Sequence, residues 1–298
     1  MTSATYRIAF VAIAFLSSPF ARCQTADTAF SELQNKIKGH KYLLKNFSAQ
    51  RTTLYHLSGD RLEADSPPSV KAVALFSPTE LTLNGTILTI RGKRFGLLLD
   101  RNTNAVAASP LAVEASLKVD FGTGDMDATL PTLIDQLFFT NVSQALNDIP
   151  VYLRSLIPQK LVQKGPSAAT CNPCTHWIRH GTWQQISRND SGLTLPVLIK
   201  SSEPELTRAA LVAKADVEAQ FYFVVDENGR LTELWLTHAV GYGLNESCVE
   251  VLRQQIYRPA VYRGTPVAVP LSQSIHFQAG HGSPGQYRIL SRGGIRPE

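Results

Sequence analysis

Two cysteines and two histidines lie within a ten-residue stretch, at Cys171, Cys174, His176 and His180. Thiolate and imidazole groups are the ligands that zinc prefers, and a C-x-x-C pair can also form a disulfide or a redox centre. Ligands this crowded differ from the usual zinc-finger spacing, and haem attachment requires histidine directly after the second cysteine. We therefore expect a Cys171–Cys174 disulfide and no bound metal, with a metal- or redox-linked protein as an alternative.

The N-terminus has the pattern of a secretory signal, which places these cysteines in an oxidising compartment. Arg7 precedes a short apolar run, Ile8–Leu16, and small and polar residues follow. The run is shorter than the roughly 20 residues of a membrane-spanning helix. We expect residues 1–23 to be a signal peptide cleaved after Cys23, and the protein to be periplasmic. Lipidation of Cys23 and retention of the segment as a membrane anchor are the alternatives.

Composition indicates an ordinary globular protein. The 298 residues are 44% hydrophobic and 18% charged, enough to bury a sizeable core and to form two domains. The net charge is +5, but the Lys and Arg residues are scattered along the chain. Because nucleic-acid binding requires clustered basic residues, we do not expect a nucleic-acid partner.

The first part of the chain is rich in strand signals. Short runs of Leu, Val, Ile and Phe alternate with turn residues, and Asn84-Gly85 is typical of a tight hairpin. Helical spacing follows over 130–161, where two prolines interrupt it. We predict a β-rich N-terminal domain at 24–162 with a closing helical segment, then a linker at 163–192 that contains the C-x-x-C pair.

The last part predicts an α+β domain at 193–278. Its pattern is helix, strand, strand, helix, strand: Glu205–Ala215, Val217–Val225, Leu231–Ala239, Asn245–Ile256 and Val267–Phe277. Gly229 is expected to supply the positive φ of the turn between the first two strands. These elements predict two layers, with helices against a three-stranded antiparallel sheet. Residues 279–298 are expected to be a flexible tail.

The sequence from Val217 to Pro270 resembles the C-terminal domain of the TonB family, periplasmic modules that engage outer-membrane transporters in Gram-negative bacteria. Four motifs carry the resemblance in order: the hairpin V-E-x-x-F-x-F-V-V-D-E-N-G-R-L, the helix entry G-Y-G-L-N-E-S-C, the phrase I-Y-R-P-A, and the turn G-T-P-V-A-V-P. The resemblance covers about 193–278 and does not extend to the first half of the chain.

The resemblance implies that the last strand lies at a sheet edge and accepts an extended peptide by strand addition. An edge strand has unpaired backbone groups that supply the affinity. The implied partner is a TonB-dependent outer-membrane transporter or another envelope protein. A structural protein that pairs two copies through the same edge is the alternative. The expected binding residues are Val267, Val269, Leu271, Ser272, Gln273, Ser274, Ile275 and His276.

Signals for catalysis and for energy transduction are missing. The sequence contains no Gly-rich phosphate loop, no H-E-x-x-H and no G-x-S-x-G, so we predict a non-enzymatic protein without a cofactor. Motor-coupled members of the family have a histidine in an uncleaved membrane helix and a long Pro- and Lys-rich spacer. Ile8–Leu16 contains no histidine, and the middle of this chain has the composition of a folded domain.

Overall fold

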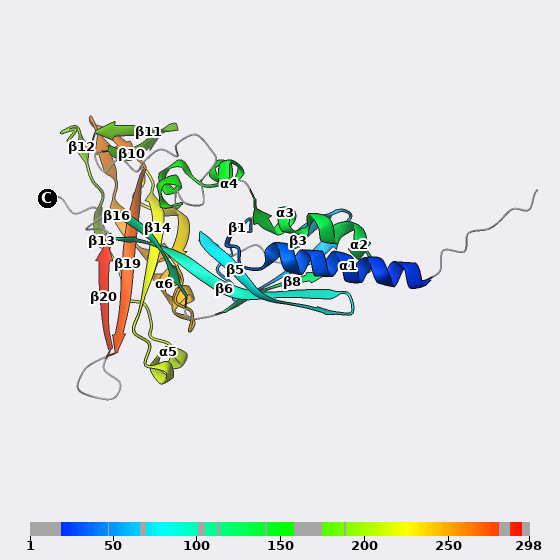
Figure 1. Cartoon of the computed structure of the whole chain (residues 1–298). Coiled ribbons are helices and arrows are strands. Elements are labelled where there is room, and N and C mark those ends of the chain that lie inside the picture. Colours follow the sequence, from blue (N-terminus) through cyan, green and yellow to red (C-terminus); the bar gives the residue numbers. More distant parts are fainter. Residues whose placement is uncertain are drawn as a thin grey trace, which may run out of the picture.

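The computed structural model describes residues 19–46, 48–65, 70–100, 105–111, 114–140, 142–157, 175–187, 189–279 and 287–293. Cys171 and Cys174, together with residues 1–18, lie outside these ranges. The fold is α+β and rich in strands, as the sequence predicts (Figure 1). No helix within the described ranges is both long and apolar enough to cross a bilayer.

The first half of the chain forms a curled sheet, the N-terminal sheet, with strand order β3-β2-β8-β6-β5-β1-β9 and β7 paired to β6. Its strands are β1 Tyr42–Leu44, β2 Thr52–Ser58, β3 Arg61–Ala64, β5 Ala74–Asn84, β6 Ile87–Asp100, β7 Ala105–Pro110, β8 Ala115–Asp120 and β9 Phe138–Phe139. The predicted hairpin at Asn84-Gly85 joins β5 to β6, and Gly85 has a φ of 60°.

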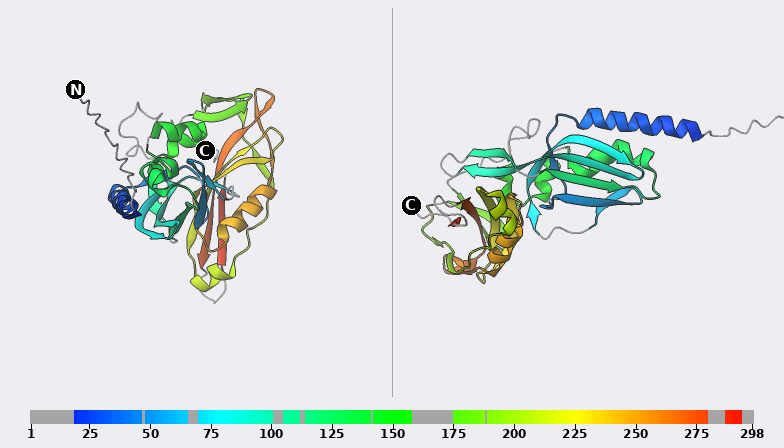
Figure 2. Two further views of the ribbon diagram at one scale, coloured as in Figure 1. Left: turned by 90° about the vertical axis from the view of Figure 1, so that its right-hand side faces the viewer. Right: turned by 90° about the horizontal axis from the view of Figure 1, so that it is seen from below.

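Helices line this sheet because their apolar residues share a core with it. Helix α1, Pro19–Ile37, packs through Leu33 and Ile37 and runs along the sheet (Figures 1 and 2). It includes the last residues of the predicted signal peptide. The predicted helical segment is a series of short pieces: α2 Met126–Thr129, η1 Leu130–Thr132, α3 Leu133–Leu137, α4 Val142–Asp148 and η2 Val151–Leu156.

The second half is built on a five-stranded sheet, the C-terminal sheet, with order β20-β19-β14-β15-β4. Its strands are β14 Val217–Val225, β15 Leu231–His238, β19 Val269–Ala279, β20 Tyr287–Gly293 and β4 Lys71–Ala72. The expected sheet had three strands, but two more chain segments pair with its borders. Strand β4 comes from the first half of the chain and runs parallel to β15. Strand β20 lies within the expected tail.

Two helices cover one face of the C-terminal sheet: α5 Arg208–Ala213 and α6 Leu244–Gln254. Leu244, Leu252 and Cys248 of α6 are fully buried against Phe221 and other residues of the sheet. Burial raises the pKa of the Cys248 thiol to about 12. This cysteine is therefore a packing residue.

The other face of the C-terminal sheet is covered by the first half of the chain. Tyr222, Val224 and Trp235 share a core with Leu75 and Leu97 of the N-terminal sheet. Gly96 of β6 lies so close to β15 that an added Cβ would be 2.7 Å from the His238 ring. The predicted two-layer arrangement thus has a third layer, because β14 is apolar on both faces.

Part of the predicted linker is also ordered. Strands β10 Thr175–His180 and β11 Thr182–Ser187 form a hairpin, and the N–H and C=O groups of Arg179 pair with those of Ala268. Three short antiparallel strand pairs complete the second half of the chain. They are β12 Leu193–Thr194 with β17 Ala260–Tyr262, β17 with β18 Thr265–Val267, and β13 Val197–Lys200 with β16 Ile256–Arg258.

Candidate functional site

The predicted peptide-binding strand is an interior strand of the C-terminal sheet. Along one side it pairs with β14 from Val269 to Phe277, and along the other it pairs with β20 from Gln273 to Ala279. The expectation of a bare edge on β19 is therefore wrong. The backbone groups of β19 that were expected to be unpaired lie opposite β20 instead. This pairing satisfies the general requirement that main-chain groups be hydrogen-bonded.

The side chains of the predicted site divide between packing and pairing. Leu271 and Ile275 are buried beneath the helices, whereas Val267 and Val269 pack beneath the β10–β11 hairpin. Gln273 and Ser274, expected among the binding residues, are only 4% and 6% exposed.

Ser272 and His276, the remaining polar residues of the predicted site, are partly exposed. Ser274 Oγ lies 3.4 Å from Gln220 Nε2, and His276 Nε2 lies 2.6 Å from Asp216 Oδ1. Ser272 is partly buried. The backbone of β19 and most of these side chains thus have partners within the described part of the chain.

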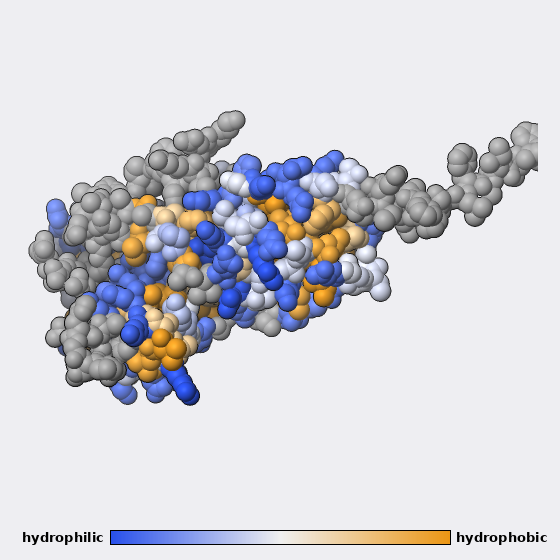
Figure 3. Space-filling view, turned by 60° about the horizontal axis from the view of Figure 1, so that its bottom comes forward, coloured by the Kyte–Doolittle hydropathy of each residue, from blue (hydrophilic) through white to orange (hydrophobic). Residues whose placement is uncertain are grey.

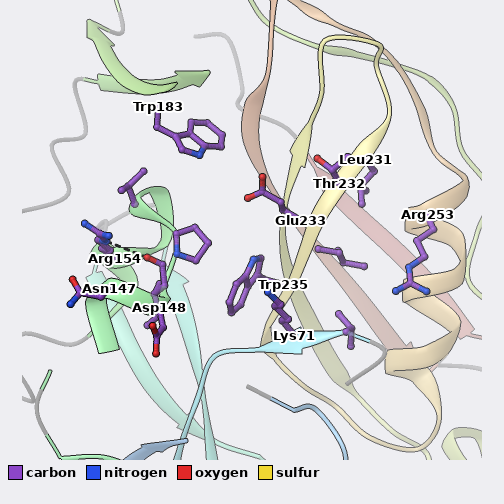
Figure 4. Close-up of a pocket in the computed structure, with 15 residues that line it drawn as sticks. Lys71, Asn147, Asp148, Arg154, Trp183, Leu231, Thr232, Glu233, Trp235 and Arg253 are labelled. Carbon is purple, nitrogen blue, oxygen red and sulfur yellow. Dashed lines mark hydrogen bonds between the residues drawn. The ribbon is translucent and has the colours of Figure 1, made fainter. Parts of the chain in front are cut away.

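A second candidate is a cavity of about 650 Å³ between the two halves of the molecule (Figure 4). Its size is in the range of small-ligand sites. Three segments supply most of its walls: the α4–η2 region, strand β15, and the start of β4. The polar and aromatic residues that line it are Lys71, Asn147, Asp148, Arg154, Trp183, Thr232, Glu233, Trp235 and Arg253.

Glu233 is the most constrained residue of this cavity. Its φ of 49° lies in the left-handed region, which few residues other than glycine adopt. The register of β14 against β15 shifts at this point, so Glu233 belongs to a β-bulge. Bulges re-aim side chains and often accompany functional sites, and a strained residue persists only where its surroundings hold it.

Two segments hold the Glu233 carboxylate, and a third contacts both of them. Oε2 accepts a hydrogen bond of 2.9 Å from the Tyr152 hydroxyl of η2, and Oε1 lies 2.6 Å from Arg179 Nη1 of β10. The Arg179 guanidinium and the Tyr152 ring both contact Trp183, with centroid distances of 4.9 and 5.0 Å. Burial and the neighbouring Glu233 charge raise the pKa of Tyr152, so the phenol remains a donor. The network therefore joins both halves at the cavity wall.

A smaller cavity of about 430 Å³ adjoins the first and shares Val70 and Arg253 with it. Ala49 and Val249 supply apolar walls, and Glu246 and Glu250 of α6 supply carboxylates. The two cavities therefore differ in charge, since basic residues are concentrated in the larger one.

The metal hypothesis receives no support from the described ranges, where no three His, Cys, Asp or Glu side chains are grouped to hold an ion. His176 and His180 lie at opposite ends of β10. The predicted disulfide pair lies outside those ranges and stays a prediction.

Comparison with known proteins identifies no relative: no family model matches the chain, and no curated protein does. Sequence reasoning also missed the cavity between the halves. Leu231–His238 is predicted as a plain strand, and nothing in its sequence marks the bulge at Glu233. The partners Tyr152 and Arg179 lie far from it in the chain, so only the tertiary fold brings them together.

Proposed function

We propose that this protein is a non-enzymatic periplasmic binding protein that captures an extended segment of an envelope partner by strand addition to β19. In this proposal 193–278 is a TonB-like module, and a TonB-dependent outer-membrane transporter is the leading partner. Strand β20 occupies the acceptor edge when no partner is bound, and the partner strand replaces it. The order of helices and strands and the four sequence motifs support the resemblance.

The observation that carries the proposal is the pairing of β19 with β20. Seven residue pairs, from Gln273–Gly293 to Ala279–Tyr287, are in antiparallel register. This border of the sheet thus has the twist and spacing that an added strand needs. Backbone hydrogen bonds provide most of the affinity in strand addition, so a guest of different sequence can use the same edge.

Replacement of β20 by a partner strand is favoured because β20 lies at the border of the sheet. Within the described residues it pairs with β19 alone, whereas β14 pairs on both sides. Border elements open at a lower free energy than the core does. A guest that binds only the open state has an apparent Kd equal to its intrinsic Kd divided by the open fraction. Weakening β20 should therefore tighten binding of the partner.

Replacing Leu290 and Ser291 together by proline in the full chain tests this exchange. Proline lacks the N–H that a ladder requires, and two adjacent prolines remove a donor directed at β19 whichever of the two faces it. We expect peptides from the N-termini of outer-membrane transporters to bind the double-proline variant at least about tenfold more tightly than the wild type, as measured by fluorescence anisotropy.

Two further peptides serve as controls. A peptide with the sequence of 287–293 should bind the double-proline variant and compete with transporter peptides, whereas the same peptide with N-methylated alternate residues should not bind. Binding of neither the 287–293 peptide nor any transporter peptide to the double-proline variant would overturn the proposal. Binding of the 287–293 peptide alone would retain the acceptor edge and reject transporters as the partner.

A further inference from the structure

The border of the C-terminal sheet opposite β20 is only partly paired. Strand β4 pairs with Trp235 and Leu236 of β15, and the N–H of Val73 donates to the carbonyl of Leu236 at 3.0 Å. The preceding residues, Leu231–Leu234, line the larger cavity instead. No strand in the described part of the chain pairs with them on that side. Among the described residues, a stretch of sheet edge between the Arg230–Ile256 bridge and β4 is thus without an outer neighbour and lies along one wall of a cavity.

The charges around this edge favour an acidic guest. Lys71 and Arg154 both line the cavity, and neither forms an ion pair with a described carboxylate. Lys71 Nζ lies 5.2 Å from the centre of the Trp235 ring, and Arg154 Nε donates to the carbonyl of Ile149 at 3.2 Å. Figure 4 shows Arg154 on the α4–η2 wall and Lys71 beside β15.

The carboxylates of the same cavity do not cancel this charge. Arg179 and Tyr152 already hold Glu233, which leaves Asp148 as the one acidic side chain in the lining without an ion pair to a described residue. Arg253 lies between the two cavities. Beyond it, Glu246 and Glu250 would repel an acidic guest. An acidic segment is therefore favoured in the larger cavity alone.

The bulge at Glu233 restricts which strands can pair with this edge. A bulge and a fixed charge on an edge strand are features that prevent indiscriminate pairing with other chains. Glu233 combines both, because its φ of 49° bends β15 while Arg179 and Tyr152 fix its carboxylate. A guest must match the bent edge and avoid the Glu233 charge.

We propose that the larger cavity binds an extended acidic peptide, which adds as a short strand beside Leu231–Leu234 and places carboxylates against Lys71 and Arg154. Four residues of edge span about 13 Å at the usual rise per residue, which suits a short peptide segment. The site is independent of β19, since β14 lies between β15 and β19 in the sheet. The protein would then hold two chain segments at once.

Two short synthetic peptides test the proposal by isothermal titration with the full chain: one of alternating glutamate and valine, one of alternating lysine and valine. The acidic peptide should bind, and the basic peptide should bind at least about tenfold more weakly. Replacing both Lys71 and Arg154 by alanine should weaken the acidic peptide about tenfold, because each replacement removes a charge-assisted hydrogen bond. The matched control replaces Lys93 and Lys118, two exposed lysines that do not line the cavity.

Two further measurements distinguish binding at this cavity from binding at β19 and from binding that does not use the peptide backbone. The double-proline variant of β20 should bind the acidic peptide with unchanged affinity, whereas N-methylation of the acidic peptide should abolish binding. Equal affinity for the acidic and basic peptides would overturn the proposal. So would unchanged affinity in the Lys71 and Arg154 variant, or tighter binding by the β20 variant, which would assign the peptide to β19. Failure of transporter peptides on β19 would leave this result untouched.

Discussion

Replacement of Gly229 by alanine is expected to lower the free energy of unfolding by about 3 kcal/mol. Gly229 has a φ of 75°, a conformation that costs a residue with a Cβ about 1 kcal/mol or more. An added Cβ would also overlap the carbonyl oxygen of Tyr257, and overpacking against fixed backbone costs a further 1–3 kcal/mol, approximately. Chemical denaturation of the full chain measures the loss.

The large effect arises because this turn is hydrogen-bonded to β16, the strand that follows α6. The carbonyl of Gly229 accepts a hydrogen bond of 2.9 Å from the N–H of Tyr257, and Asp226 Oδ1 accepts one of 2.7 Å from the N–H of Arg230. Gly264 is the matched control, since its φ is 86° but nothing lies within 4 Å of an added Cβ. Its replacement by alanine should cost only about 1 kcal/mol. Equal losses at both positions would contradict the packing argument.

Replacement of Arg94 by methionine is expected to stabilise the protein by about 1–3 kcal/mol. Arg94 is 3% exposed, and its Nε and Nη2 atoms have no hydrogen-bond partner among the described residues. Burial lowers the pKa of its guanidinium to about 10. A buried guanidinium with unsatisfied donor groups destabilises the folded state, whereas methionine fills much of the same volume without the charge.

Arg91 on the same strand provides the comparison for Arg94. Its side chain is exposed and lies 3.5 Å from Glu80, an ion pair whose loss costs less than about 1 kcal/mol. Its replacement by methionine should therefore have little effect on the midpoint of urea denaturation. If the Arg94 variant were instead less stable than the wild type, the contacts of the guanidinium would outweigh the cost of burying its charge, and the expected gain in stability would be wrong.

Local signals in the sequence predicted the elements around β14 well. The run from Val217 to Val225 is a strand with the predicted bounds, and Gly229 has the positive φ that its turn required. Helix α6 also follows its apolar spacing closely. Each of these features depends on residues close together in the chain, which is why periodicity and turn chemistry were sufficient.

Long-range pairing was not predictable in the same way. Strand β4 has two residues, and its role depends on β15, more than 160 positions away. Strand β20 follows a stretch rich in glycine and proline that resembles a tail. One signal was available in the sequence: five consecutive residues of β14, from Phe221 to Val225, are aromatic or aliphatic. A continuous apolar run of this kind predicts a strand covered on both faces, which the two-layer interpretation did not use.

The candidate site differed from its prediction for the same reason. The residues from Val267 to His276 were correctly placed on the strands that end the module, but whether their outer side is open depends on Tyr287–Gly293. The cavity near Glu233 depends on three segments that only the folded chain brings together. Sequence patterns locate elements, whereas the free edges of a sheet are a property of the whole fold.

Hydrogen exchange of the backbone amides tests the central claim most directly. A partner strand can replace β20 only if β20 detaches from β19 without unfolding of the whole protein. In the full chain, the amides of Tyr287–Gly293 should exchange with solvent at least about 100-fold faster than those of β14. Addition of a transporter peptide that binds should slow exchange of the β19 amides that face β20. Equal protection of β20 and β14 would mean that the edge opens only when the whole protein unfolds, and would contradict the account.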